Sequence, residues 1–244
     1  MSDPILSIRN VTKRFGGLTA VDDVSFDVAR GAFLGIAGPN GSGKSTLFNV
    51  LTRIPFGPTS GAVSFDGQRI DRLAPHKIAA MGLARTFQKD VEFPDLTATE
   101  TVAISATYAR GVARPELHAA AAAALDEVSF DAKRRTMPTT ALSVFERKQL
   151  MIASALVMGP KVLMLDEPAS GLTRPEIAAL EALLRQINRT GVTVILIEHV
   201  LGLLMAVSEH LLVLNQGKLL AQGDPRTVMQ DPRVIEAYLG SRAA

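Results

Sequence analysis

The sequence contains no cysteine, and this absence excludes disulfide bonds, thiolate metal sites and cysteine nucleophiles together. It also lacks the basic N-terminal segment followed by a longer apolar one that marks a secretory signal. No uninterrupted apolar run approaches the roughly 18 residues that a membrane-spanning helix needs. We therefore expect a soluble chain, compatible with a reducing cytoplasm, that reaches any membrane through a partner.

The chain also has little net charge, with a formal value of +2 over 244 residues. Proteins that bind nucleic acid through its phosphates usually carry a larger and more clustered positive charge. We therefore expect no nucleic-acid partner. With 47% hydrophobic residues, the chain is long and apolar enough for one large domain, which we expect to span residues 1–244.

A glycine-rich segment fits the pattern G-x-x-x-x-G-K-[ST], the P-loop that cradles the phosphates of a nucleoside triphosphate. Its residues are Gly38, Pro39, Asn40, Gly41, Ser42, Gly43, Lys44, Ser45 and Thr46. A short apolar run precedes it and a helical pattern follows it, so its backbone N–H groups would converge at the positive end of a helix. We expect Lys44 to contact the β- and γ-phosphates and the Ser45 hydroxyl to ligate Mg²⁺.

Two carboxylates end an apolar strand pattern at residues 162–165. Because α/β folds bind ligands at the carboxyl ends of strands, we expect Asp166 to hold Mg²⁺ through water and Glu167 to orient or deprotonate the attacking water. The next strand pattern, residues 192–197, is followed by Glu198 and His199. We expect His199 to lie beside the γ-phosphate. Without a P-loop in the same chain, these groups would be no more than a solvated turn and a structural histidine.

The distribution of strand and helix patterns predicts the architecture. Short β patterns dominate residues 5–65 and favour a partly antiparallel sheet. Residues 99–158 have an almost wholly α-helical pattern, which predicts an inserted helical subdomain at about 89–160. Near-continuous apolar strands then return around a helix at 175–188, as a parallel sheet covered on both faces requires. A last helical element is expected at about 225–240.

The order of these motifs resembles that of an ATP-binding-cassette (ABC) ATPase along essentially the whole chain. The resemblance implies an α/β P-loop NTPase fold with a parallel core sheet, a small antiparallel β-subdomain and an inserted helical subdomain, and it implies hydrolysis of ATP. It also implies that Phe15 stacks on adenine, that Gln88 links Mg²⁺ to the transporter-contacting helical subdomain, and that His199 is the switch histidine. Such ATPases close head to tail around two ATP molecules, and each site is completed by the other subunit's signature.

Three segments, at residues 82–88, 215–218 and 231–240, look like those of the ATPase subunits of branched-chain amino acid importers. This resemblance implies an energy-coupling subunit for import of branched-chain or other hydrophobic amino acids. Its partners would be membrane permease subunits, a second ATPase subunit and, indirectly, a solute-binding protein, at the cytoplasmic face of the inner membrane. Urea and short-amide importers, and the lipopolysaccharide-export ATPase, share parts of this ending.

The signature departs from the family pattern of Leu-Ser-Gly-Gly-Gln, which in this branch is something like Leu-Ser-Tyr-Gly-Gln/Glu. The chain reads LSVFE at residues 142–146, so Phe145 occupies a glycine position. Ser143 would contact the nucleotide of the partner subunit, and its spacing from Glu146 also predicts a capping box that starts a helix. Because a side chain at the glycine position occupies space that the phosphate needs, the sequence favours a heterodimer with one weak site over a homodimer.

Three other functions fit parts of the sequence. A cytosolic ABC protein acting on nucleic acid or ribosomes would resemble fused cassettes or carry long coiled-coil insertions, and this short single cassette has neither. A regulatory subunit that barely hydrolyses ATP is disfavoured by the intact Lys44, Asp166, Glu167 and His199. A P-loop GTPase is disfavoured because the chain has no Asn-Lys-x-Asp motif to read guanine.

Overall fold

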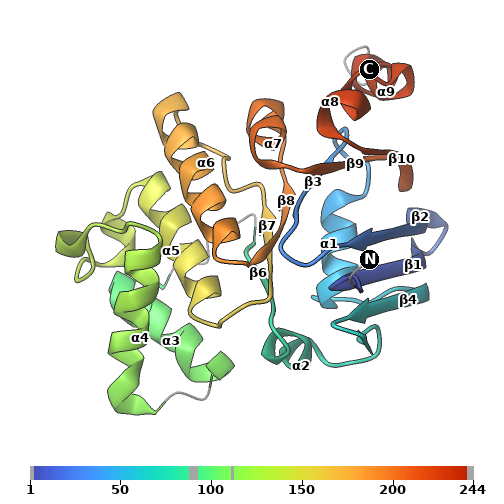
Figure 1. The fold of residues 1–244 in the computed structure, drawn as a ribbon. Helices are drawn as coiled ribbons and strands as arrows, with labels where there is room; N and C mark the ends of the chain where they lie inside the picture. Colours follow the sequence, from blue (N-terminus) through green and yellow to red (C-terminus); the bar gives the residue numbers. More distant parts are fainter. Residues whose placement is uncertain (1–2, 88–92, 111–112, 241–244) are drawn as a thin grey trace.

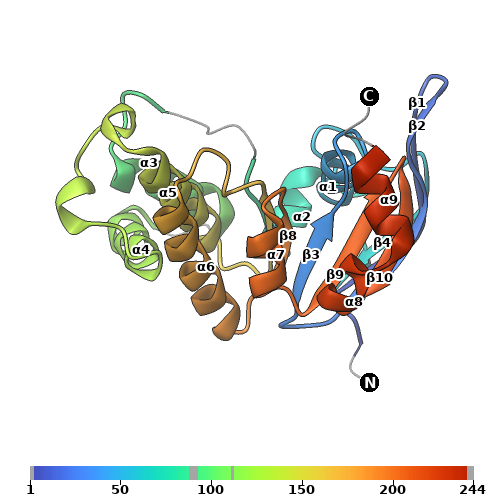
Figure 2. The ribbon, with the colours of Figure 1, turned by 90° about the horizontal axis from the view of Figure 1, so that it is seen from above.

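Two β-sheets and a separate lobe of helices make up the computed structural model, which describes residues 3–87, 93–110 and 113–240 (Figure 1). The larger sheet lies in the middle, with the lobe of helices on one side and the smaller sheet on the other (Figures 1 and 2). This arrangement confirms the expected α/β fold with a core sheet, a small β-subdomain and an inserted helical subdomain.

The larger sheet has the strand order β10-β9-β3-β8-β7-β6. Its strands are β3 (Phe33–Ala37), β6 (Leu83–Arg85), β7 (Val162–Asp166), β8 (Thr193–Ile197), β9 (His210–Asn215) and β10 (Lys218–Gly223). All neighbours pair in parallel except β10, which runs antiparallel to β9 at one edge. Every residue of β3, β7 and β8 is buried, which explains why their sequences are apolar apart from Asp166 at the end of β7 and Thr193 at the start of β8.

The smaller sheet has the order β2-β1-β4-β5, and all of its pairings are antiparallel. Its strands are β1 (Leu6–Phe15), β2 (Leu18–Val28), β4 (Ser60–Phe65) and β5 (Gln68–Arg69). Strands β1 and β2 are longer than the apolar segments within their sequences. Their pairing passes through register shifts, and Asn10 takes a left-handed φ of 49° there, so the hairpin continues across residues that break the alternation.

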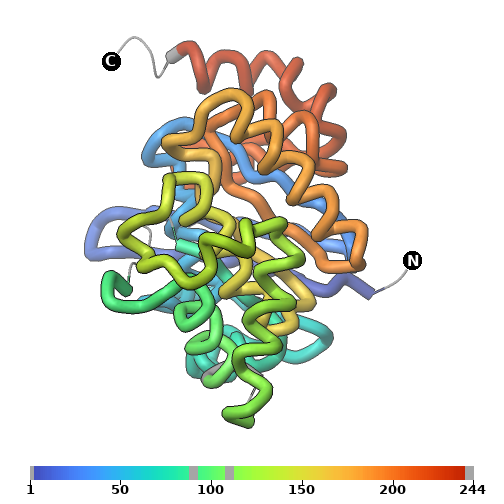
Figure 3. Tube along the Cα trace, turned by 90° about the vertical axis from the view of Figure 1, so that its left-hand side faces the viewer, coloured from blue at the N-terminus to red at the C-terminus, as the bar shows by residue number. Residues whose placement is uncertain are grey.

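The helices surround the larger sheet. They are α1 (Lys44–Thr52), α2 (Pro75–Ala80), α3 (Ala98–Arg110), α4 (Arg114–Glu127), α5 (Val144–Leu156), α6 (Arg174–Arg189), α7 (Leu201–Val207), α8 (Pro225–Met229) and α9 (Pro232–Gly240). Helices α3, α4 and α5 pack on one another as the helical subdomain, which faces the viewer in Figure 3. Helices α8 and α9 form the expected C-terminal helical element.

The segment between α4 and α5 differs from the near-continuous helix expected over residues 99–158. It holds two short 3-10 turns, Ala132–Arg134 and Thr139–Ala141. Ser129, just after α4, takes a left-handed φ of 55°, and Pro138 has no N–H to offer a helix. The expected helix is wrong in this segment because Ser129 and Pro138 interrupt it, although their neighbours favour a helix.

Alternate residues of the buried strands enter two separate apolar cores. In β7, Leu163 and Leu165 join the core that packs against helices α3 to α7. Met164 points the other way, into the core formed with α1, α2 and the smaller sheet. Because apolar groups cover both faces of these strands, the polar groups of a site must stand at strand ends.

Three segments that are far apart in the sequence meet at Asp66, in the turn between β4 and β5. Its carboxylate contacts the guanidinium of Arg30 and the ammonium of Lys161, whose Nζ lies 2.5 Å from Oδ2. The hydrogen bonds from Lys161 and Arg30 hold the pKa of Asp66 at about 2. This ion triad links the smaller sheet to the chain that enters β3 and β7.

We expect Asp66→Asn to be less stable than the wild type above about pH 4, with a difference that shrinks as the pH falls toward about 2. A carboxyl whose pKa is lowered by folding stabilises the fold only while it stays ionised, and protonation at low pH removes that contribution. Urea unfolding curves across this pH range measure the difference. Asp95→Asn, at an exposed aspartate, is the control. A difference independent of pH would contradict an electrostatic role for the triad.

Candidate nucleotide-binding site

The P-loop joins β3 to α1, and its turn depends on glycine. Gly43 precedes the first residue of α1 with a φ of 103°, a conformation that L side chains rarely adopt. A Cβ atom there would lie 2.4 Å from the carbonyl oxygen of Ala20 in β2. The chain can therefore pass close to β2 and still start a helix, whose first N–H groups have no intrahelical partner and suit an anion.

A groove of about 510 Å³ opens over this loop. The groove is lined by Leu18, Thr19, Ala20, Asn40, Gly41, Ser42, Gly43, Lys44, Ser45, Thr46, Glu167, His199, Gln216 and Gly217. The fold thus brings Lys44 and Ser45 together with Glu167 and His199, which lie more than a hundred residues later in the sequence. A phosphate-binding loop and a carboxylate–imidazole pair that share one cavity can bind a nucleotide and activate water.

Lys44 is held inside its own loop. Its Nζ donates hydrogen bonds to the carbonyl oxygens of Gly38, at 2.8 Å, and of Pro39, at 3.1 Å. Burial lowers the pKa of Lys44, while the carboxylates of Glu167 and Asp166 oppose that shift. The ammonium is therefore positioned before any phosphate arrives.

Glu167 and His199 contact each other across the groove. Nε2 of His199 lies 2.6 Å from Oε1 of Glu167. Glu167 takes a left-handed φ of 52°, which costs a side-chain-bearing residue about 1–2 kcal/mol, and its N–H donates to the carbonyl oxygen of Ile197 at 2.9 Å. The backbone strain at the end of β7 turns this carboxylate toward the groove and the imidazole.

Glu198 is a site residue to which the sequence analysis assigned no role. Its side chain is buried, and its carboxylate accepts hydrogen bonds from the N–H groups of Ala169 (2.6 Å), His199 (3.1 Å) and Val200 (3.4 Å). Burial raises the pKa of Glu198, and the N–H donors oppose that shift. Glu198 therefore joins the loop after Glu167 to the turn that carries His199. The sequence signal that could have identified Glu198 is its position directly before His199, just after the apolar strand pattern.

Arg85 is a second residue that the sequence analysis missed. Its Nη2 lies 2.8 Å from Oδ2 of Asp166, and both side chains are buried. Nη1 donates to Oδ1 of Asn49 in α1 at 2.6 Å, and the guanidinium lies over the rings of Phe48 and Phe87. Burial raises the pKa of Asp166, while the Arg85 cation opposes that shift. Only the pairing of β6 with β7 brings the two charges together, so no local pattern could reveal them.

One oxygen of Asp166 fits a metal site. Among the described residues, Oδ1 of Asp166 is buried and has no hydrogen-bond partner. A buried carboxylate oxygen costs free energy unless it is paired. Mg²⁺ in nucleotide sites takes one or two protein oxygens and completes its octahedral shell with phosphate oxygens and water. The remaining oxygen of Asp166 and the Ser45 hydroxyl are the kind of protein ligand that such a site uses.

Phe15 ends β1 with 43% of its surface exposed. Its ring packs edge-on against Phe56, with centroids 4.9 Å apart, and the Lys13 ammonium lies 5.0 Å from its centroid. The groove lining begins three residues later, at Leu18, so an exposed aromatic stands beside the groove. Gln88 lies outside the described residues, and its role at Mg²⁺ stays a prediction.

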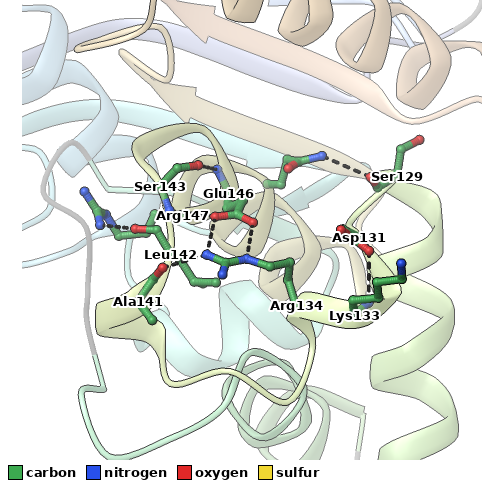
Figure 4. Close-up of polar contacts among 10 residues, drawn as sticks. Ser129, Asp131, Lys133, Arg134, Ala141, Leu142, Ser143, Glu146 and Arg147 are labelled. Atoms are coloured by element: carbon green, nitrogen blue, oxygen red, sulfur yellow. Dashed lines mark hydrogen bonds and ion pairs between the residues drawn. The ribbon is translucent and has the colours of Figure 1, made fainter.

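Ser143 lies at the start of α5 (Figure 4), and it is not among the residues that line the groove. Its Oγ accepts from the Glu146 N–H at 3.2 Å, and the Glu146 carboxylate accepts from the Ser143 N–H at 2.6 Å, which confirms the predicted capping box. Arg134 donates twice to the same carboxylate, at 2.7 and 3.0 Å. Phe145 is partly buried against the core of the helical subdomain.

Comparisons with known proteins identify the family of the chain. A family described as ABC transporter matches residues 21–170, and one described as branched-chain amino acid ATP-binding cassette transporter matches residues 218–244. The chain is 40% identical to the high-affinity branched-chain amino acid transport ATP-binding protein BraF of Pseudomonas aeruginosa, over 98% of this chain and 99% of that protein. It is 35% identical to the Escherichia coli protein LivG, which has the same description, over 98% and 99%.

Solved structures give the same result. A nucleotide-free ATP-binding cassette from an ABC transporter matches with a TM-score of 0.88 and 28% identity, over 97% of this chain and 99% of that one. A cassette in its ADP conformation matches with a TM-score of 0.87 and 28% identity, over 98% and 100%. Because the first family match covers more than half of the chain and the curated relatives cover nearly all of it, the chain belongs to the ABC transporter family, as an ATP-hydrolysing subunit.

Proposed function

We propose that this chain is the energy-coupling ATPase of an importer of branched-chain or other hydrophobic amino acids. The observation that carries the proposal is the convergence of Lys44, Glu167 and His199 on one groove over the P-loop. The substrate class is supported by BraF and LivG, which are described as branched-chain amino acid transport proteins, and by the match over residues 218–244.

The groups in and beside the groove have distinct roles in the proposed hydrolysis. The P-loop amides and Lys44 bind the β- and γ-phosphates, and Phe15 stacks on adenine. Ser45 and Asp166 would hold Mg²⁺, which would supply positive charge beside the phosphates. Glu167 orients the attacking water and accepts its proton. Its contact with His199 holds the carboxylate in place before the γ-phosphate is bound.

The proposed partner at the inner membrane is a permease, which docks in a groove of about 330 Å³ between β6 and the helical subdomain. Phe87 and Phe93 line this groove and are 38% and 41% exposed, which suits the apolar face of a partner helix. Arg85, the ion partner of Asp166, lines it too. A docked permease would lie beside the proposed Mg²⁺ site at the cytoplasmic face. Within the described residues, every helix is too short or too polar to cross a bilayer.

The second proposed partner is a different ATPase subunit with an intact signature. A signature helix binds the γ-phosphate of the opposite subunit through its serine and its N-terminal amides. In this chain the Glu146 carboxylate, which is paired with Arg134, already accepts from the Ser143 N–H and would compete with a phosphate for this amide. Phe145 replaces the glycine that permits close approach. The site completed by this signature is therefore the weak one of the pair.

Glu167→Gln should lower ATP turnover in the assembled complex by about 10²–10⁴-fold, because the amide cannot accept the proton of water. ATP binding should change little, because the phosphate contacts remain, and a closed dimer should accumulate. Turnover assays and size-exclusion chromatography with ATP measure both effects. Glu209→Gln, at an exposed glutamate, is the control, and Lys44→Ala should instead weaken ATP binding. Wild-type turnover by Glu167→Gln would remove Glu167 from its assigned role.

A cysteine introduced at Asp95 should crosslink to a co-expressed permease. The chain has no cysteine of its own, so the label has a single attachment point. Asp95 is exposed and lies two residues from Phe93 in the docking groove, whereas Glu92, the alternative position for the label, lies outside the described residues. Arg189→Cys, exposed at the end of α6 and outside the groove, is the control. Equal or stronger crosslinking from Arg189 would argue against this docking face.

The purified subunit alone should hydrolyse ATP at least about tenfold more slowly than its mixture with the partner ATPase, since a homodimer has the weak signature in both sites. Glu146→Gln should raise the rate of the subunit alone, because it removes the competing charge while keeping the helix. Phe145→Gly tests the glycine position, with thermal unfolding to check that the helix survives. Brisk, cooperative turnover of the subunit alone, unchanged by either substitution, would refute the unequal pair.

A further inference from the structure

The C-terminal segment contacts the P-loop at two points. The N–H of Gly38 donates a hydrogen bond to the hydroxyl of Tyr238 in α9, at 2.8 Å and across 200 residues of sequence. In the turn between β9 and β10, the N–H of Gly217 donates to the carbonyl oxygen of Ser42 at 3.0 Å. Both ends of the loop before α1 are therefore held by residues that follow the last strand of the parallel sheet.

Gly38 lies between Tyr238 and Lys44. Its N–H contacts the Tyr238 hydroxyl, and its carbonyl oxygen accepts from Nζ of Lys44 at 2.8 Å. Its φ of 146° and the space around it leave no room for a side chain, since a Cβ atom would lie 2.2 Å from the carbonyl oxygen of Leu214. One constrained residue thus connects the phenol of α9 with the ammonium expected to bind phosphate.

Helix α9 is held in place by packing against the core, so it can support the P-loop. Val234 is fully buried in the core shared with the helices, and Tyr238, one turn later, packs partly buried against the same core. Asp231, before the helix, accepts from the Arg233 N–H at 2.8 Å. Burial raises the pKa of Tyr238, so its hydroxyl stays protonated and neutral near pH 7. Because α9 is packed against the core, the hydroxyl of Tyr238 is held at a fixed position beside the P-loop.

We propose that Tyr238 is a positioning residue for ATP binding, which fixes the Gly38 N–H and, through the Gly38 carbonyl, the place of Lys44 before the nucleotide arrives. Without the phenol, the Gly38 N–H loses its partner and the loop samples other orientations. ATP then binds more weakly, in proportion to the lost fraction of competent loop. This inference rests on the proposed role of the P-loop in binding the phosphates of ATP.

Tyr238→Phe removes one hydroxyl and keeps the ring. We expect the Kd for a fluorescent ATP analogue, measured on the full chain, to rise about three- to tenfold, as for the loss of one hydrogen bond. In the assembled complex KM should rise by a similar factor while kcat stays within about twofold, because the residue acts on binding and not on water. Tyr108→Phe, the same change at the other tyrosine, should leave both values unchanged.

A second variant separates positioning from support of the fold. Val234→Ala loosens the packing of α9 but keeps the hydroxyl, so it should lower the Tm while the Kd stays within about twofold. Wild-type Kd in Tyr238→Phe, or an equal rise in Val234→Ala, would overturn the inference. Slow amide exchange of Gly38 in the nucleotide-free wild type is a requirement that needs no variant, and fast exchange would also overturn it. Unchanged binding in Lys44→Ala would instead overturn the proposed role of the P-loop.

Discussion

The core strands of this protein are buried on both faces, and the site depends on that burial. Strands β3, β7 and β8 have no exposed residue, so their chains can carry polar groups only where they end. Parallel pairing brings those ends to one edge. The P-loop follows β3, Asp166 ends β7 and is followed by Glu167, and Glu198 and His199 follow β8. One constraint on packing therefore gathers the groups that we propose to bind phosphate and activate water.

Those groups could be predicted from the sequence because each belongs to a local pattern. The P-loop carries its own glycine spacing, and the acids at Asp166 and Glu167 follow an apolar run that can only be a buried strand. The capping box at Ser143 and Glu146 is likewise a matter of spacing along one helix, and the structure contains it. Where a site depends on a few consecutive residues, a local pattern in the sequence is enough to predict which residues come together.

The remaining contacts depend on the fold and could not be predicted in the same way. Arg85 meets Asp166 only because β6 pairs with β7, and Tyr238 meets Gly38 only because α9 packs beside the P-loop. No spacing rule joins residues 81 or 200 positions apart. The helix predicted between α4 and α5 is absent because one residue in a left-handed conformation and one proline outweigh the helix propensity of their neighbours.

Arg85 couples a movement in the apolar groove to the electrostatic potential at Asp166. Its guanidinium lines the apolar groove on one side and neutralises Asp166 on the other, and both side chains are shielded from water. In such a setting, the interaction between two charges changes steeply with their separation, because little solvent screens it. Any body that enters the groove and displaces Arg85 alters the potential at the carboxylate at the end of β7. A contact on the apolar surface of the groove is thereby converted into a change of electrostatic potential beside the P-loop.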